Sequence, residues 1–177
     1  MANYKEIVTK AVLGKGKKTF TNTYTVTPSC EATTVLGCWV INHTFRGIKE
    51  GDKVVIEGSF DVNIWYSCEN DTSTEVIKER QTYRETVSVR EKESAESQEE
   101  EIIVRSLKQP TCTSTAIEDG KIIYTIEKEL GVELVGDTKV KIQYDEEEEP
   151  WDNLDEEELP EDALKQIDEE VNEDYLN

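Results

Sequence analysis

The sequence predicts an all-β fold, namely an antiparallel β-sandwich of about eight strands followed by a largely disordered acidic tail. A long stretch of alternating apolar and polar residues runs from 53 to 89, and shorter strand-like segments separated by turn residues surround it. No convincing helical periodicity occurs before residue 145. We therefore expect a β-sandwich domain over residues 1–144 and a separate tail over residues 145–177.

The central stretch predicts a long β-hairpin. Its first half, 53–68, places apolar residues on even positions and polar ones on most odd positions, and only Gly58 interrupts the apolar set. Successive strand side chains point to opposite faces, so one face is expected to be buried. The polar segment 69–73 has the length of a hairpin loop, and the return strand continues to Val89. Such a hairpin needs a second layer over its apolar face.

The segments before the hairpin are less uniform. Periodicity does not separate a helix from a buried strand over 4–13, and 14–18 is expected to be a loop because it is rich in glycine and lysine. The threonine-rich and aromatic segment 19–27 predicts a strand. The segment 35–41 is apolar on both faces, which predicts the most buried strand.

The segments after the hairpin predict the remaining strands. Residues 90–101 contain no apolar anchor and are expected to form a mobile loop. A strand over 102–107 is expected to end at Pro110, and Glu118–Gly120 has the residue types of a hairpin turn. Further strands are expected at 111–117, 121–126 and 139–144.

The charge is concentrated at one end of the chain. The formal net charge is −20, and the segment 145–177 holds 17 of the 40 acidic residues with a single lysine. This acidity argues against nucleic acid and anionic membranes as partners, and favours basic proteins, cations or simple solubility. The sequence starts without the apolar run of a signal peptide and has no stretch of membrane-helix length, so we expect no membrane insertion and a cytosolic origin.

Catalytic and metal-binding patterns are weak. His43 is the single histidine, so triad and zinc chemistry lack a second imidazole, and a structural role is favoured. Glu57 and Asp61 share a strand face, but a glycosidase pair would also need a supporting pocket. We predict a protein that is not an enzyme, with no catalytic residue, cofactor, metal or small-molecule substrate.

Two features of the body are candidates for self-association. Trp65 lies on the polar face of its strand, next to Asn63, where it marks either a contact surface or a site covered by the domain's own second layer. Cys68 and Cys112 lie beside a loop and a proline, where accessible thiols would cross-link subunits under oxidising conditions. Burial is the commoner fate of cysteine, however, and cytosolic thiols are reduced by default.

The acidic tail is interrupted by apolar residues, which favours recognition of a partner over a purely solubilising role. A short helix from Pro160 would be marginal without a partner. The predicted partner-binding residues of the tail are Trp151, Leu154, Leu159, Leu164, Ile167 and Val171.

Several blocks occur in the order found in one known family. They are 4–12 (Tyr-Lys-Glu-Ile-Val-Thr-Lys-Ala-Val), 36–43 (Leu-Gly-Cys-Trp-Val-Ile-Asn-His), 57–67, 74–77, 109–112 and 135–140, followed by the tryptophan-bearing acidic tail. In these the chain resembles the CotE family of outer spore coat proteins of endospore-forming bacteria. The resemblance implies a morphogenetic scaffold, made in the mother-cell cytoplasm and then part of the spore coat.

The resemblance also assigns roles to the two parts of the chain. It implies that the body self-associates into a homo-oligomer around the forming spore and that the tail contacts other coat proteins. It does not settle whether Cys30, Cys38, Cys68 or Cys112 forms a disulfide. Two other interpretations of the protein's function remain open: a weak calcium-binding module, and a small-ligand-binding or hydrolytic sandwich.

Overall fold

The structure is a computed structural model that describes residues 3–91 and 100–144. The described residues divide into two units, one formed by Val8–Val140 and the other holding the described residues 3–7 and 141–144. All regular elements in the described ranges are β-strands, which confirms the predicted all-β class. In the second unit, the Lys5 ammonium lies 4.1 Å from the centre of the Tyr144 ring.

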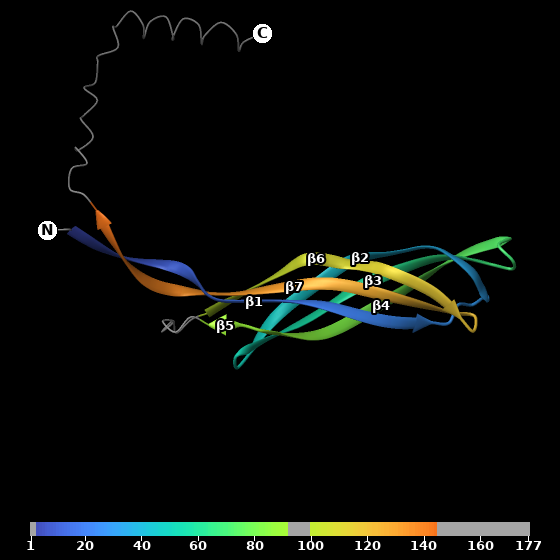
Figure 1. The fold of residues 1–177 in the computed structure, drawn as a ribbon, viewed down its shortest axis with the longest axis horizontal. Helices are drawn as coiled ribbons and strands as arrows, with labels where there is room; N and C mark the ends of the chain where they lie inside the picture. The colour runs from blue at the N-terminus through green and yellow to red at the C-terminus, as the bar shows by residue number, and fades with distance from the viewer. Residues whose placement is uncertain (1–2, 92–99, 145–177) are drawn as a thin grey trace, which may run out of the picture. The chain divides into compact units, whose positions relative to one another are not determined.

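The strands form two sheets (Figure 1). One sheet has the order β5-β1-β7-β6, with β1 at Asn3–Val26, β5 at Arg90–Glu91, β6 at Glu100–Glu118 and β7 at Lys121–Tyr144. The other has the order β2-β3-β4, with β2 at Ala32–Glu50, β3 at Lys53–Cys68 and β4 at Ser73–Ser88. The described ranges thus hold six long strands and one two-residue strand, and not the expected eight or so.

The predicted central hairpin is confirmed. β3 and β4 pair antiparallel from Lys53↔Ser88 to Cys68↔Ser73 without a register shift. The turn between them contains three residues with positive φ, and the Thr72 amide donates to the Cys68 carbonyl over 3.2 Å. The predicted turn between β6 and β7 is also present, with positive φ at Asp119 and Gly120, as a type I′ turn requires.

The two sheets share a core that is arranged as two clusters. Each cluster takes buried side chains from both sheets, so the sheets pack face to face, and each fully buried large apolar side chain contributes about 1.5–3 kcal/mol. The first contains Ala32, Phe60, Val62, Ile64, Tyr66, Cys68, Ile122, Tyr124 and Ile126. The second contains Phe20, Val54, Ile56, Val87, Leu130, Val132 and Leu134.

A charged group occupies the inward-facing position between these clusters on β7. Lys128 lies between Ile126 of the first cluster and Leu130 of the second, and it is 0% exposed. Its ammonium donates to Glu85 Oε1 and Asn22 Oδ1, each over 3.1 Å, and lies 4.3 Å from the centre of the Tyr83 ring. A buried ammonium needs such partners because its desolvation is costly.

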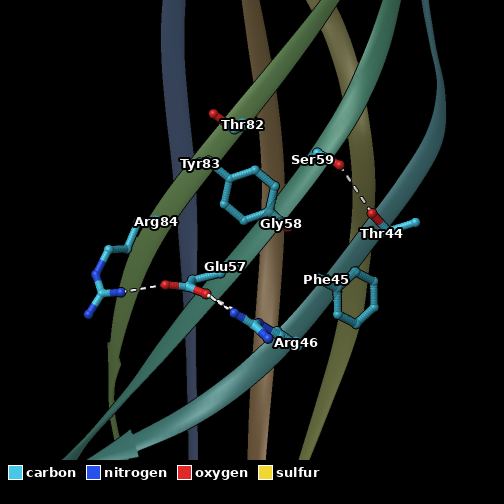
Figure 2. Close-up of a pocket in the computed structure, with 9 residues that line it drawn as sticks. All are labelled: Thr44, Phe45, Arg46, Glu57, Gly58, Ser59, Thr82, Tyr83 and Arg84. Carbon is cyan, nitrogen blue, oxygen red and sulfur yellow. Dashed lines mark hydrogen bonds and ion pairs between the residues drawn. The ribbon is translucent and has the colours of Figure 1, made fainter.

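Gly58 is the corresponding interruption on β3. A Cβ at this position would lie 2.4 Å from the Tyr83 ring and 2.7 Å from the Thr44 carbonyl oxygen. The Tyr83 ring therefore fits against β3 only because residue 58 has no side chain (Figure 2). Gly58 and Lys128 together explain why the apolar core is split in two.

The predicted loop at 14–18 is wrong, because β1 runs through it without a break. Gly14 and Gly16 allow a close approach instead: a Cβ on Gly16 would lie 2.1 Å from the Ser88 carbonyl oxygen, and Gly14 pairs with Glu91 of β5. The segment 4–13, left open between helix and strand, lies within the same strand. At these two positions glycine allows close contact with a neighbouring strand and does not form a turn.

The prediction of the most buried strand is also wrong. The segment 35–41 lies on β2, an edge strand whose Leu36, Trp39 and Ile41 are exposed. The most buried strand is β3, which lies at the centre of its sheet and packs seven fully or nearly fully buried apolar side chains against the other sheet. Those residues are Val54, Ile56, Phe60, Val62, Ile64, Tyr66 and Cys68.

Pro110 does not end a strand, contrary to the prediction. It lies within β6, between Lys108 and Thr111, where the register with β7 shifts. β6 is an edge strand, and a proline is tolerated at an edge or a bulge because its missing N–H removes no internal ladder bond. The two strands predicted at 102–107 and 111–117 are therefore one, and those predicted at 121–126 and 139–144 are both parts of β7.

Two expectations fall wholly or partly outside the described residues. Of the loop expected at 90–101, the ends belong to β5 and β6, and 92–99 lie outside the described ranges. The acidic tail at 145–177, including its expected short helix, also lies outside them. The described ranges contain no helix with the length and apolar character needed to cross a bilayer.

Candidate functional site

An exposed aromatic surface lies on the outer face of the β2-β3-β4 sheet. Trp65 on β3 is 43% exposed, and its cross-strand neighbours are Gly37 on β2 and Val76 on β4. Trp39 on β2 is also 43% exposed, and its neighbour on β3 is Asn63. These registers bring the predicted pair, Trp65 and Asn63, together with a second tryptophan.

The side chain of Trp39 is turned towards Trp65. Its ring atom Cζ3 lies 3.2 Å from the position that a Cβ on Gly37 would take, so the indole extends over Gly37. Gly37 is the residue directly opposite Trp65, so the Trp39 indole extends towards Trp65 on the same sheet face. Two further exposed apolar residues, Ile41 and Val76, lie beside them on the same sheet face. We call Trp39, Ile41, Trp65 and Val76 the tryptophan face.

Charges of both signs border this face. The Asn42 amide donates to Asp61 Oδ2 over 2.8 Å, and the Arg80 guanidinium lies 3.9 Å from Asp61 Oδ1. A shallow groove begins there, with a volume of about 320 Å³. The residues that line it are Ile41, Asn42, Asp61, Asn63, Lys78, Glu79 and Arg80. The arrangement combines exposed aromatic area with a mixed-charge rim, as protein contact surfaces do.

A wider cleft lies further along the same sheet, around Glu57 (Figure 2). The Glu57 carboxylate accepts hydrogen bonds from Arg46 over 2.7 Å and from Arg84 over 2.5 Å. The Arg46 hydrogen bond is the main cause that lowers the pKa of Glu57 below its usual value. A glycosidase acid needs a raised pKa, so this environment does not favour catalysis by Glu57 with Asp61.

His43 has the structural surroundings expected for it. A bulge between Ile41 and Thr44 changes the register of β2, and Nε2 of His43 lies 2.7 Å from the Tyr83 hydroxyl. Nδ1 lies 3.1 Å from Gln109 Oε1. Burial lowers the pKa of His43, and the Lys128 charge acts in the same direction, whereas the hydrogen bond to Gln109 Oε1 raises the pKa. Among the described residues there is no group of three or more His, Cys, Asp and Glu side chains placed to hold a metal ion.

For the two cysteines named as cross-linking candidates, the structure favours the alternative of burial. Cys68 is 1% exposed within the first core cluster, and Cys112 is half-buried beside that cluster. Neither presents a freely exposed thiol for contact with another molecule. The predicted partner-binding residues of the tail all lie outside the described ranges.

Trp39 is the surface residue that sequence reasoning missed. The segment 35–41 is apolar on both faces, which predicted a buried strand. Trp39 is exposed because β2 lies at the edge of its sheet. Alternation alone places Trp39 and Ile41 on one face, but only the register with β3 shows that this is the face of Trp65.

The fold and this surface together define an all-β protein whose most distinctive described feature is an exposed aromatic surface. The family model for outer spore coat protein E (CotE) matches residues 3–174, nearly the whole chain. The chain therefore belongs to the CotE family of spore coat proteins, which implies a location in the outer coat of the spore. No curated protein and no solved structure matches the chain.

Proposed function

We propose that this chain is a morphogenetic scaffold that is made in the mother cell, self-associates around the forming spore and recruits other outer coat proteins. The observation that carries the proposal is the tryptophan face, since two exposed indoles on the same face of one sheet are costly to leave in water. Family membership supports the location, and the exposed face supports the association.

The occupant proposed for the tryptophan face is a second copy of the chain. Its rim carries Asp61 beside Arg80 and Lys78, so the same surface on two molecules can pair acid with base about a two-fold axis. Aromatic residues at the centre and charges at the rim are the usual order of such contacts.

The edge of β4 extends this surface. Val76 of the tryptophan face lies on β4, the edge strand that follows β3 in its sheet. The registers of edge strands β2 and β6 each shift three times, whereas that of β4 does not shift. A regular edge is a better template for pairing with another strand than a bulged one. A contact at the tryptophan face would therefore continue into edge pairing through β4.

Recruitment is proposed for the tail, residues 145–177. Its apolar residues, with Trp151 and Leu154 first, would anchor it on partner proteins, and its 17 acidic residues would favour basic partner surfaces. Weak contacts of single tails become strong when an array of self-associated bodies presents many of them together.

Light scattering on the full chain in reductant tests the self-association. We expect concentration-dependent assemblies of defined size, and Trp65→Thr should raise the midpoint concentration about 10-fold or more, as loss of a central aromatic contact does. Leu107→Thr is the matched control, because Leu107 is also exposed but lies on β6. A chain that is monomeric at all concentrations, or equal effects of both substitutions, would contradict the proposal. The same measurement on residues 1–144 separates the contribution of the tail.

A further inference from the structure

The four cysteines lie in two pairs, although they are far apart in the sequence. Cys30 lies in the connection between β1 and β2, and Cys68 is the last residue of β3. Ala32, two residues after Cys30, is the cross-strand partner of Cys68. Cys30 packs against the cluster that contains Cys68, and Cys30 is the main cause that raises the pKa of the Cys68 thiol, so the two thiols are neighbours.

The second pair joins the two sheets. Cys38 lies on β2 and Cys112 on β6, and their cross-strand partners are Ile64 and Ile126, both of the first core cluster. Cys38 and Cys112 pack against this cluster from opposite sheets, and Cys112 contributes to the raised pKa of the Cys38 thiol, so these two thiols are also neighbours. Each thiol therefore has one specific sulfur neighbour.

We infer that these residues are the sites of two intrachain disulfides, Cys30–Cys68 and Cys38–Cys112, that form by exchange with a low-molecular-weight disulfide. A disulfide needs a sulfur–sulfur distance of about 2.05 Å and a suitable dihedral angle, which two thiols that are neighbours at one core cluster can reach with small side-chain movements. This placement differs from the sequence expectation, in which Cys68 and Cys112 cross-link separate subunits.

The exchange balances in two steps. A cysteine thiolate attacks the low-molecular-weight disulfide, so a mixed disulfide forms and one small thiol leaves. The neighbouring protein thiol then loses its proton and displaces the second small thiol, which closes the protein disulfide. The two protein sulfurs are oxidised and the small disulfide is reduced to two thiols.

The structure indicates which thiol reacts first in one pair, and that the reaction is slow. Cys30 is partly exposed, whereas Cys68 is buried, so Cys30 attacks and Cys68 resolves the mixed disulfide. The Cys30 hydrogen bond and burial raise the pKa of Cys68 to about 11. Burial and the Cys112 contact raise the pKa of Cys38 as well. The Cys68 and Cys38 thiolates are therefore scarce at neutral pH, so mildly alkaline solution accelerates closure.

The two bonds have separate structural consequences. Cys38–Cys112 ties β2 to β6, two edge strands of opposite sheets, and Cys30–Cys68 ties the first inter-sheet connection to the end of the central hairpin. A disulfide that closes a long loop stabilises the folded state, and each bond should raise the midpoint of thermal unfolding by roughly 5–15 °C. The inference holds whether or not the chain self-associates.

Peptide mapping of the folded full chain tests the pairing. The chain is incubated with oxidised glutathione at mildly alkaline pH, the remaining thiols are alkylated, and proteolytic peptides are identified by mass spectrometry. We expect peptides linked by Cys30–Cys68 and Cys38–Cys112 within single chains, with no increase in covalent mass beyond the monomer. Other pairings, links between chains, or glutathione adducts alone would overturn the inference.

Two single variants provide the controls. Cys30→Ala and Cys112→Ala each remove one member of one pair, and each should keep the other disulfide and about half of the thermal shift. The double variant should show no shift on oxidation. If a variant fails to fold, the map of the unaltered chain still decides, because it identifies each bond directly.

Discussion

The buried ammonium of Lys128 provides the sharpest test of how this core is built. Replacement by Met retains the length and apolar volume of the stem but removes the charge between the two clusters. Glu85 then loses the cation 3.1 Å from its carboxylate, and Asn22 loses its hydrogen-bond donor. The Glu85 side chain is 18% exposed, so water compensates only part of this loss.

The expected cost of Lys128→Met is about 3 kcal/mol, the lower end of the range for breaking a buried ion pair, because Glu85 retains some solvent contact. With a urea dependence of about 1–3 kcal/mol per molar, the unfolding midpoint should fall by roughly 1–3 M. Far-UV circular dichroism is the appropriate signal, since Trp39 and Trp65 are already exposed in the folded chain.

A double variant and an exposed control make the test specific. Lys128→Met combined with Glu85→Gln removes both charges and should recover most of the loss, to within about 1 kcal/mol of the unaltered chain. Lys17→Met removes an exposed cation whose ammonium is 3.9 Å from Glu129, and should change stability by about 0.5 kcal/mol or less. A Lys128→Met variant as stable as the Lys17→Met variant would refute the view that this ion pair supports the core.

Two further predictions concern the neighbours of Lys128. Gly58→Ala places a Cβ 2.4 Å from the Tyr83 ring and 2.7 Å from the Thr44 carbonyl oxygen, and should lower the free energy of unfolding in urea by about 1–3 kcal/mol. Gly51→Ala is the control: its Cβ has no atom within 4 Å, so it should show only the smaller cost of its positive φ. The pKa of His43 is lower in the folded chain than in the unfolded chain, so the unfolded chain binds the imidazole proton more tightly. The free energy of unfolding is therefore highest above the unfolded pKa of about 6.5, and it falls as the pH drops below this value towards the folded pKa. Urea unfolding of the unaltered chain and of His43→Gln between about pH 7.5 and pH 5 checks this, because His43 is the one histidine of the chain; equal slopes for both would contradict it.

Much of the fold could be predicted from local pattern. The alternation from Val54 to Cys68 defined a strand with one buried face, and the structure buries these even positions, with Gly58 as the interruption. The turns at 69–72 and 118–120 could also be predicted from the sequence, because their residue types match the positive φ values that the chain adopts there.

The strand boundaries could not be predicted from local sequence pattern in the same way. Gly14, Gly16 and Pro110 look like breaks in the sequence, yet each lies inside a continuous strand. The glycines sit where β1 passes close to the backbone of Ser88 and Arg90, and the proline sits at a register shift of an edge strand. Whether such a residue ends a strand depends on what lies beside it, which local pattern does not contain.

The sequence by itself determined the all-β class, the buried face of the central hairpin, the concentration of acid at 145–177 and, through its blocks, the family. Tertiary structure alone decided that Trp39 lies on the same sheet face as Trp65 and that Lys128 is buried beside Glu85. It also decided that all four cysteines lie in or against the first core cluster, with Cys30 near Cys68 and Cys38 near Cys112. The physical reason is the distance along the chain over which each kind of interaction acts. Alternation and turn chemistry act between residues close in the chain, whereas edge position, sheet register and the packing of two sheets bring together residues that are distant in it.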